Sequence, residues 1–196
     1  MMMNNIAKPG DVHGKGGDQL TALEKENRQL LSRIAELERL VRRDTLTPLY
    51  NRRHFIETLD QWIWRAHRYG GDFGLMFIDV DQLKAINDQH GHDAGDKMLI
   101  TIAKALQNSV RRSDIVARMG GDEFGMLLEN INVTALPDKA DKISKAISKQ
   151  WFDYEGHSLK PAISIGFTAI EGGVAAAEHL TRADKSMYEA KQAKQR

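Results

Sequence analysis

A heptad pattern in residues Asp18–Asp44, a stretch without Gly or Pro, constrains the fold of this chain most. Its seam positions, all but one of them apolar, alternate spacings of three and four, as the a and d positions of a coiled coil do. They are Leu20, Leu23, Asn27, Leu30, Ile34, Leu37 and Val41. A seam this narrow needs a partner helix, and an Asn at an a position favours two parallel strands in register. We therefore expect residues 18–43 to form the coiled-coil dimerisation helix of a homodimer. The alternative is an amphipathic helix that folds back on its own domain.

Composition narrows the function classes. The chain has 196 residues and a net charge of +1, so no basic excess supports duplex nucleic-acid binding. It has no Cys, which excludes disulfides, thiolate zinc sites and cysteine nucleophiles. No apolar run approaches the roughly 18 residues of a membrane helix, and the first residues lack the layout of a secretory signal. We expect residues 1–17 to be a disordered leader, and the protein to be cytoplasmic, with no nucleic acid and no membrane as partner of this chain.

Residues 44–196 alternate between helical and strand patterns. Helices are expected over Arg52–Tyr69, Asp93–Val110, Leu136–Gln150 and Ala175–Lys194, and strands over Phe73–Val80, Ile115–Met119, Phe124–Leu128 and Ala162–Ile170. The order is helix, β-α-β-β-α-β, helix. It predicts an α+β fold of ferredoxin-like type, an antiparallel sheet with flanking helices packed on one face. Gly120 and Gly121 are expected to supply the positive φ of a tight hairpin.

Acidic residues stand where a buried strand ends. Phe73–Val80 is almost wholly apolar until Asp79, and Asp122 lies between the next two strands. If those strands pair beside the first, Asp79 and Asp122 become neighbours and can form an all-oxygen Mg²⁺ site. A solvated strand-end acid and a turn acid would give the same pattern, so the residues alone leave both interpretations open.

Three further residues could contact a nucleotide. Lys84 could touch phosphates, although a lone lysine is normally a surface residue. An amide at Asn87 and a carboxylate at Asp96 could satisfy the acceptors and donors of a guanine edge. Taken without context, Asn87-Asp88 and Gly91-His92 are more typical of a simple loop. The chain has no G-x-x-x-x-G-K-[ST] loop, which excludes the P-loop mode of nucleotide binding.

Several ordered motifs resemble the GGDEF family of diguanylate cyclases over about Asp44–Lys194. They are Asp44-x-Leu46-Thr47-x-Leu49-x-Asn51-Arg52-Arg53, Asp79-x-Asp81-x-x-Lys84-x-x-Asn87-Asp88, Gly91-His92, Gly95-Asp96, Gly120-Gly121-Asp122-Glu123-Phe124, Ser164-x-Gly166 and Ala183-Asp184-x-x-x-Tyr188-x-Ala190-Lys191. The chain departs from the family pattern at Pro48, where Gly is usual, and at Leu83, where an aromatic residue is usual. It also lacks the closing Lys-x-x-Gly-Arg.

The resemblance implies a dimeric enzyme that condenses two GTP into cyclic di-GMP and releases two pyrophosphates. It implies that Asp79, the carbonyl of Val80 and Asp122 hold Mg²⁺, or Mn²⁺. Asp122, with Glu123, would accept the proton of the 3′-hydroxyl. Lys84 and Lys191 would contact phosphates, and Asn87, Asp96 and His92 would contact the substrate at or near guanine.

The pair Arg111-x-x-Asp114 resembles the family's inhibitory product site, where it would bind cyclic di-GMP. A solvated charge pair at a helix end is the structural alternative. A second function is a catalytically inactive GGDEF-type domain that acts as a cyclic di-GMP receptor. A related cyclase that makes mixed dinucleotides and an inert coiled-coil adaptor are further alternatives.

Overall fold

The computed structural model describes residues 13–195. The chain divides into two compact units, Met1–Val41 and Arg42–Arg196. Most of the first unit is the helix α1 (His13–Arg42). We expected this helix to begin at residue 18, and it begins earlier. Residues 1–12 of the expected leader lie outside the described residues. Along α1, the side chains of Leu20, Leu23, Leu30, Ile34, Leu37 and Val41 are between 51% and 64% exposed. The pairing of this seam with a second helix stays a prediction.

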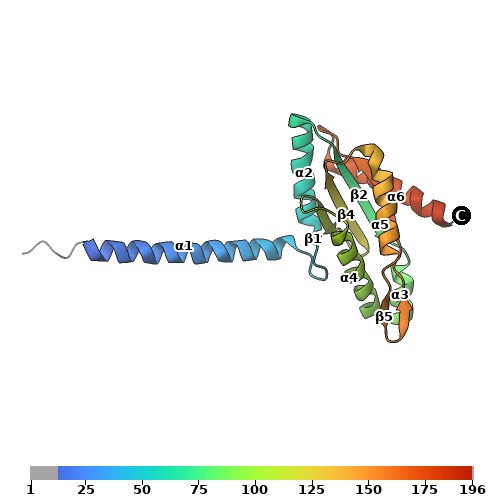
Figure 1. The fold of residues 1–196 in the computed structure, drawn as a ribbon, viewed down its shortest axis with the longest axis horizontal. Helices are drawn as coiled ribbons and strands as arrows, with labels where there is room; N and C mark the ends of the chain where they lie inside the picture. The colour runs from blue at the N-terminus through green and yellow to red at the C-terminus, as the bar shows by residue number, and fades with distance from the viewer. Residues whose placement is uncertain (1–12, 196) are drawn as a thin grey trace, which may run out of the picture. The chain divides into compact units, whose positions relative to one another are not determined.

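The second unit is built on a five-stranded sheet of order β1-β3-β4-β2-β7 (Figure 1). Its strands are β1 (Tyr50–Asn51), β2 (Phe73–Val80), β3 (Ile115–Arg118), β4 (Glu123–Glu129) and β7 (Ile163–Ala169). The neighbours among β3, β4, β2 and β7 are all antiparallel, which confirms the ferredoxin-like β-α-β-β-α-β core. The two-residue strand β1 adds a parallel edge to β3, which we did not predict.

Helices cover both faces of this sheet, so the prediction that they pack on one face is wrong. Helices α2 (Arg52–Tyr69) and α6 (Ala176–Gln195) bury one face, and α4 (His92–Asn108) and α5 (Leu136–Ile147) bury the other. The side chains of β2 explain why. Leu75 and Phe77 pack with the buried residues of α2 and α6, and Met76 and Ile78 pack with those of α4 and α5. A strand that is apolar at consecutive positions needs cover on both sides.

Besides β1, four short elements were not predicted. Helix α3 (Leu83–His90) is polar and begins after Gln82, whose φ is 61°. Strands β5 (Phe152–Tyr154) and β6 (His157–Leu159) form a hairpin whose turn residues, Glu155 and Gly156, both have positive φ. A single 3₁₀ turn, η1 (Val133–Ala135), precedes α5. None of the described helices is long and apolar enough to cross a membrane.

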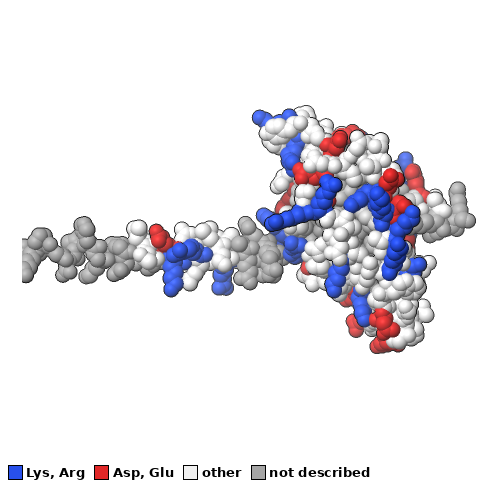
Figure 2. All heavy atoms as spheres, viewed as in Figure 1, with Lys and Arg blue, Asp and Glu red and all other residues white. Residues whose placement is uncertain are grey.

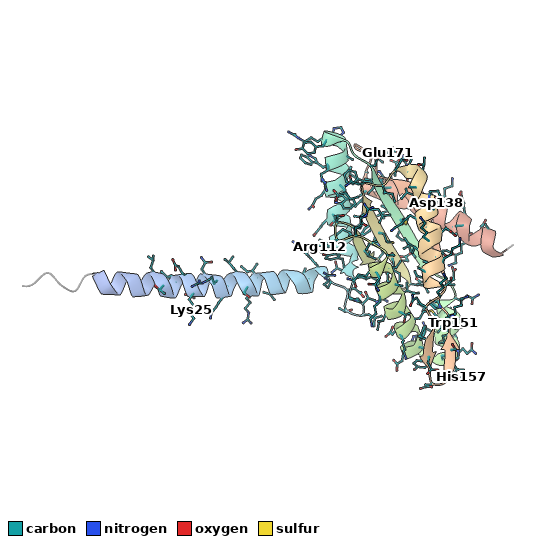
Figure 3. All side chains as sticks on the ribbon, viewed as in Figure 1. Lys25, Arg112, Asp138, Trp151, His157 and Glu171 are labelled. Atoms are coloured by element: carbon teal, nitrogen blue, oxygen red, sulfur yellow. The ribbon has the colours of Figure 1, made fainter. Side chains whose placement is uncertain are left out.

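The two ends of the sheet carry different elements. Figure 3 labels Trp151 and His157 at the end where the β5–β6 hairpin lies, and Glu171 at the opposite end. The rings of His90 and His157 lie 4.9 Å apart, which places the end of α3 beside the hairpin. Since α3 follows directly on β2, the carboxyl end of β2 lies toward the hairpin end of the domain.

Candidate active site

Three acidic residues come together where β2 ends and β4 begins. Asp79 pairs with Glu123 across the two strands, and the N–H of Val80 donates to the carbonyl of Asp122 at 3.0 Å. This is the register that the sequence required if Asp122 was to lie beside Asp79. We call Asp79, Asp122 and Glu123 the acidic strand end.

The charges of the acidic strand end affect one another. Burial raises the pKa of Glu123, and the negative charges of Asp122, Asp79 and Asp184 raise it further against the opposing effect of Arg52. Carboxylates that gather in a partly buried place disfavour each other's charged form. The cluster therefore carries more negative charge than its surroundings neutralise and favours a cation.

Lys191 of α6 supplies one cation. Its Nζ donates to Asp79 Oδ1 at 2.5 Å, where the lysine side chain is 35% exposed and the aspartate 16%. The hydrogen bond to Asp79 raises the pKa of Lys191, and the charges of Asp79, Asp81 and Asp122 add to it. Lys191 therefore lies within electrostatic range of three aspartates.

A glycine explains how Lys191 reaches the strand end. A Cβ on Gly166 of β7 would overlap backbone atoms of Ala183 and Met187 in α6. The helix backbone therefore lies directly on the strand, a close approach that only Gly permits. This contact fixes the path of α6, along which Lys191 extends to the neighbouring strand β2.

The loop that carries the signature, Gly120–Asp122, is held by backbone and arginine contacts. Neither Gly120 nor Gly121 has a positive φ, so the hairpin explanation for these glycines is wrong. The N–H groups of Met119 and Gly120 donate to the carbonyl of Glu123 at 2.8 and 3.4 Å. A Cβ on Gly121 would meet no atom within 4 Å, so the space beside this residue is open.

Arg118 connects this loop to the start of the domain. Its Nε and Nη2 donate to the carbonyl of Gly121 at 3.2 and 2.8 Å, and its Nη1 lies 3.4 Å from Asp44 Oδ1. Burial would raise the pKa of Asp44, but hydrogen bonds from Thr47 and the charge of Arg118 outweigh it and lower that pKa. The motif at Asp44 therefore has a structural partner that sequence reasoning missed, because nothing in the chain marks Arg118 as that partner.

Asp81 is held separately from the other acids. The Ser164 hydroxyl of β7 donates to Asp81 Oδ1 at 2.7 Å, and this serine is fully buried. The N–H of Asp81 donates to the carbonyl of Ala162 at 2.9 Å. These contacts fix the chain just after Val80, whose carbonyl is one of the predicted metal ligands.

The predicted nucleotide contacts lie on α3 and at the start of α4. Lys84 is exposed in the first turn of α3, and His92 and Asp96 are exposed on α4. Asn87 packs between the two helices, where its Oδ1 is buried with no hydrogen-bond partner among the described residues. A Cβ on Gly95 would overlap that oxygen, so Gly95 makes the room for the amide. This packing fixes Asn87 at the contact between α3 and α4.

The donor set of the acidic strand end fits a magnesium ion. Among the residues that the structure describes, no cluster of three or more His, Cys, Asp or Glu side chains could hold a metal. The predicted set needs only two carboxylates, Asp79 and Asp122, and the carbonyl of Val80. Mg²⁺ commonly binds one or two carboxylates and takes its remaining ligands from water and substrate phosphates.

Arg111 and Asp114 lie together at a separate hollow of about 120 Å³. Asp114 accepts from the N–H of Arg111 at 2.9 Å and from the N–H of Glu129 at 3.1 Å. Lys139 of α5 lines the same hollow, and its Nζ donates to the carbonyl of Ser109 at 2.7 Å. Sequence reasoning missed Lys139 because it comes from a distant helix. We call this place the Arg111 hollow; Figure 3 labels its neighbour Arg112.

Charge on the visible surface is mixed. Figure 2 shows Lys and Arg side chains interspersed with Asp and Glu over the face in view. This agrees with the near-neutral net charge of the chain.

Sequence comparisons give close relatives. The chain is 36% identical over 176 residues to the diguanylate cyclase DgcP of Pseudomonas aeruginosa, covering 90% of this chain and 26% of DgcP. It is 32% identical over 185 residues to diguanylate cyclase A of Treponema denticola, covering 89% of this chain and 50% of that protein. The chain thus spans between a quarter and a half of the length of these curated relatives.

Solved structures give the same fold. The diguanylate cyclase SiaD of P. aeruginosa, crystallised with its activator SiaC, superposes with a TM-score of 0.77 at 31% identity, over 91% of this chain and 72% of that one. The coiled coil and GGDEF domain of DgcB from Caulobacter crescentus, in complex with c-di-GMP, superposes with a TM-score of 0.82. It covers 90% of this chain and 94% of that one, and at 24% identity it shows the fold alone.

A family match covers nearly the whole second unit of the chain. Residues 41–196 match the family described as diguanylate cyclase, GGDEF domain. This range contains the acidic strand end, the Asn87 amide and the Arg111 hollow. The chain belongs to the GGDEF-domain family of diguanylate cyclases.

Proposed function

We propose that this chain is an active diguanylate cyclase that condenses two GTP into cyclic di-GMP with release of two pyrophosphates. The observation that carries the proposal is the acidic strand end, where Asp79, Asp122 and Glu123 meet across paired strands. Clustered carboxylates with one lysine against them form a place for a divalent cation and a polyphosphate. The identity to named diguanylate cyclases supports the same reaction.

Each acidic residue has a role in this proposal. Asp79, Asp122 and the carbonyl of Val80 hold Mg²⁺ or Mn²⁺. When bound, the ion would neutralise charge on the phosphates and polarise the α-phosphate that the 3′-hydroxyl attacks. Asp122, together with Glu123, accepts the proton of the attacking 3′-hydroxyl.

The guanine and phosphate contacts come from α3, α4 and α6. Asn87 and Asp96 read the guanine edge: the Asn87 amide donates to the acceptors of the base, and the Asp96 carboxylate accepts from its donors. Lys84 and Lys191 contact the phosphates, and His92 lies close to the substrate. An adenine edge lacks the donor pair that Asp96 would accept, so we expect GTP to be preferred over ATP.

Catalysis requires two domains because each contributes one GTP. The heptad seam of α1 is exposed in the single chain, and its pairing with a second copy would bury it. A short tether of this kind raises the local concentration of the partner site to the order of mM. We expect removal of Met1–Val41 to make the specific activity depend steeply on protein concentration. Equal specific activity with and without this segment would refute the role of α1.

The Arg111 hollow is the proposed site of inhibition by the product. An arginine can grip a phosphate with two parallel hydrogen bonds, and Asp114 can accept from a guanine edge. The hollow lies between β3, β4 and α5, and its lining residues are distinct from the acidic strand end. We therefore propose that cyclic di-GMP inhibits the enzyme from this second site.

One assay tests the proposed reaction. The protein is incubated with GTP, ATP and Mg²⁺ together, and the products are identified by mass. The proposal predicts cyclic di-GMP and pyrophosphate, with no mixed dinucleotide. Binding of cyclic di-GMP without synthesis would instead identify a receptor, and mixed products would refute the roles given to Asn87 and Asp96.

A further inference from the structure

The ion pair between Lys191 and Asp79 occupies a ligand that the metal would need. Lys191 Nζ lies 2.5 Å from Asp79 Oδ1, and Asp79 is one of the two carboxylates in the proposed metal set. The ammonium therefore compensates the charge of this half-buried acid. A divalent cation that binds Asp79 must share this carboxylate with Lys191 or displace it.

The surroundings of Lys191 allow it to move. Its side chain is 35% exposed, whereas the Asp79 side chain is only 16% exposed and is fixed on β2, an interior strand of the sheet. A lysine ends in a compact charge on a flexible four-carbon stem, so its head can leave while α6 stays in place. The position of α6 is held independently, by its contact with Gly166.

Electrostatics gives the displaced lysine a second partner. While paired with Asp79, the Lys191 ammonium is also attracted by the negative charges of Asp81 and Asp122. A divalent cation at the same carboxylates would repel the ammonium at close range. The triphosphate that accompanies the cation brings several negative oxygens, and these give the ammonium a new partner.

We propose that Lys191 is a positioning residue that holds Asp79 in the nucleotide-free protein and transfers to the triphosphate when metal and GTP arrive together. This inference rests on the proposed function, because it assumes that Asp79 is a metal ligand. It assigns Lys191 two successive partners. Its consequence is that the free metal binds weakly until nucleotide relieves Asp79 of the lysine.

The test measures Mn²⁺ binding to the full-length protein without nucleotide, by electron paramagnetic resonance of the free ion. The variants are Lys191→Met, Asp79→Asn and, as a matched control on the same helix, Lys185→Met, whose side chain is exposed. Removal of a half-exposed ion pair and of one repelling charge should raise the Mn²⁺ affinity of Lys191→Met roughly three- to tenfold. Lys185→Met should match the parent, and Asp79→Asn should lose the site.

The same variants are then titrated with the α-thio analogue of GTP in the presence of Mg²⁺, followed by calorimetry. Here Lys191→Met should bind the analogue more weakly than the parent, because the triphosphate has lost its lysine. The opposite signs of the two effects are the mark of an exchange, which a purely structural lysine would not produce.

Two results would overturn the inference, and they can be told apart. If Asp79→Asn loses Mn²⁺ while Lys191→Met binds it as the parent does, the metal site exists and Lys191 does not compete for it. If Asp79→Asn binds Mn²⁺ unchanged, the metal site is elsewhere, and the proposed function fails together with the inference. Circular dichroism melts of each variant establish that the compared proteins are folded.

Discussion

The acidic strand end and the Arg111 hollow both bring a carboxylate next to a basic side chain, but they satisfy that carboxylate differently. In the hollow, both oxygens of Asp114 accept backbone N–H groups, from Arg111 and Glu129. At the strand end, Asp79 is held by the ammonium of Lys191, and burial together with neighbouring acids raises the pKa of Glu123.

This difference separates a carboxylate that backbone donors compensate from clustered carboxylates that a lysine side chain compensates. A carboxylate bonded to the backbone is neutralised by dipoles that are part of the fold. Clustered carboxylates repel one another, and a bound cation offsets this unfavourable electrostatic energy. The first arrangement suits a preformed recognition site, and the second suits a metal-dependent reaction.

The largest expected effect comes from removing one charge of the acidic strand end. Asp122→Asn should lower the rate of cyclic di-GMP formation about 10³-fold, because the metal supplies several kcal/mol of transition-state stabilisation. The rate is measured by chromatography of the product at saturating Mg²⁺. Asp60→Asn, at an exposed position of α2, is the control and should leave the rate unchanged. A rate within threefold of the parent would show that Asp122 is not needed for the reaction, and would contradict the role given to the acidic strand end.

The next effect concerns the unpartnered amide of Asn87. Asn87→Ala should raise the KM for GTP roughly 10- to 100-fold, since a hydrogen bond in a desolvated site is worth about 1–3 kcal/mol. Gly95→Ala should act in the same direction, because its added Cβ would displace the Asn87 oxygen. Steady-state kinetics with GTP gives both values, and Asn108→Ala, exposed at the end of α4, is the control. An unchanged KM in both variants would show that guanine is read elsewhere.

The Arg111 hollow should respond in inhibition alone. Arg111→Ala should raise the inhibition constant of cyclic di-GMP about tenfold or more, through loss of a charge-assisted bidentate contact, and leave the initial rate as it was. Progress curves with added cyclic di-GMP measure both quantities. Arg112→Ala removes an exposed neighbour of equal charge and should not alter inhibition. Unaltered inhibition in Arg111→Ala would show that product acts at another place.

The smallest expected effect is on stability, at Asp44. Asp44→Asn should cost about 1 kcal/mol at pH 7, a value discounted for the partial exposure of this carboxylate. Because folding lowers the pKa of Asp44 below its ordinary value, its contribution to stability is present above that ordinary pKa and is lost as the pH falls through the folded pKa. The difference between variant and parent should therefore vanish in acid.

Urea unfolding at pH 7 and near pH 3 measures this difference, with Asp60→Asn as the control. Asp44 belongs to the kind of acid seen in the Arg111 hollow, since Thr47 donates to it from both its N–H and its hydroxyl at 2.7 Å. A cost at pH 7 that persists unchanged in acid would contradict this assignment.

Long elements with a clear hydrophobic period were predictable from sequence, and short polar elements were not. Helix α2 and strand β2 have the predicted bounds, because each has an unbroken apolar pattern. Helix α3 shows no buried residues, and the β5–β6 hairpin depends on a Glu155-Gly156 turn that has no strong local signal. Neither element carries a period that sequence reasoning could detect.

The candidate site was predictable in its residues but not in its contacts. Register alone places Asp122 beside Val80, so the acidic strand end followed from pairing two recognisable strands. The basic partners come from far along the chain, because Lys191 meets Asp79 and Arg118 meets Asp44. No local pattern shows which acid each of them meets. Long-range packing, such as α6 against Gly166, decides those pairs.

The most direct test is a crystal structure with Mn²⁺ and the α-thio analogue of GTP, with anomalous scattering used to locate the metal. The account predicts an anomalous peak about 2.0–2.3 Å from carboxylate oxygens of both Asp79 and Asp122. It also predicts that Lys191 Nζ lies on the phosphates and no longer on Asp79. Bound nucleotide with no peak between these two carboxylates would contradict the account.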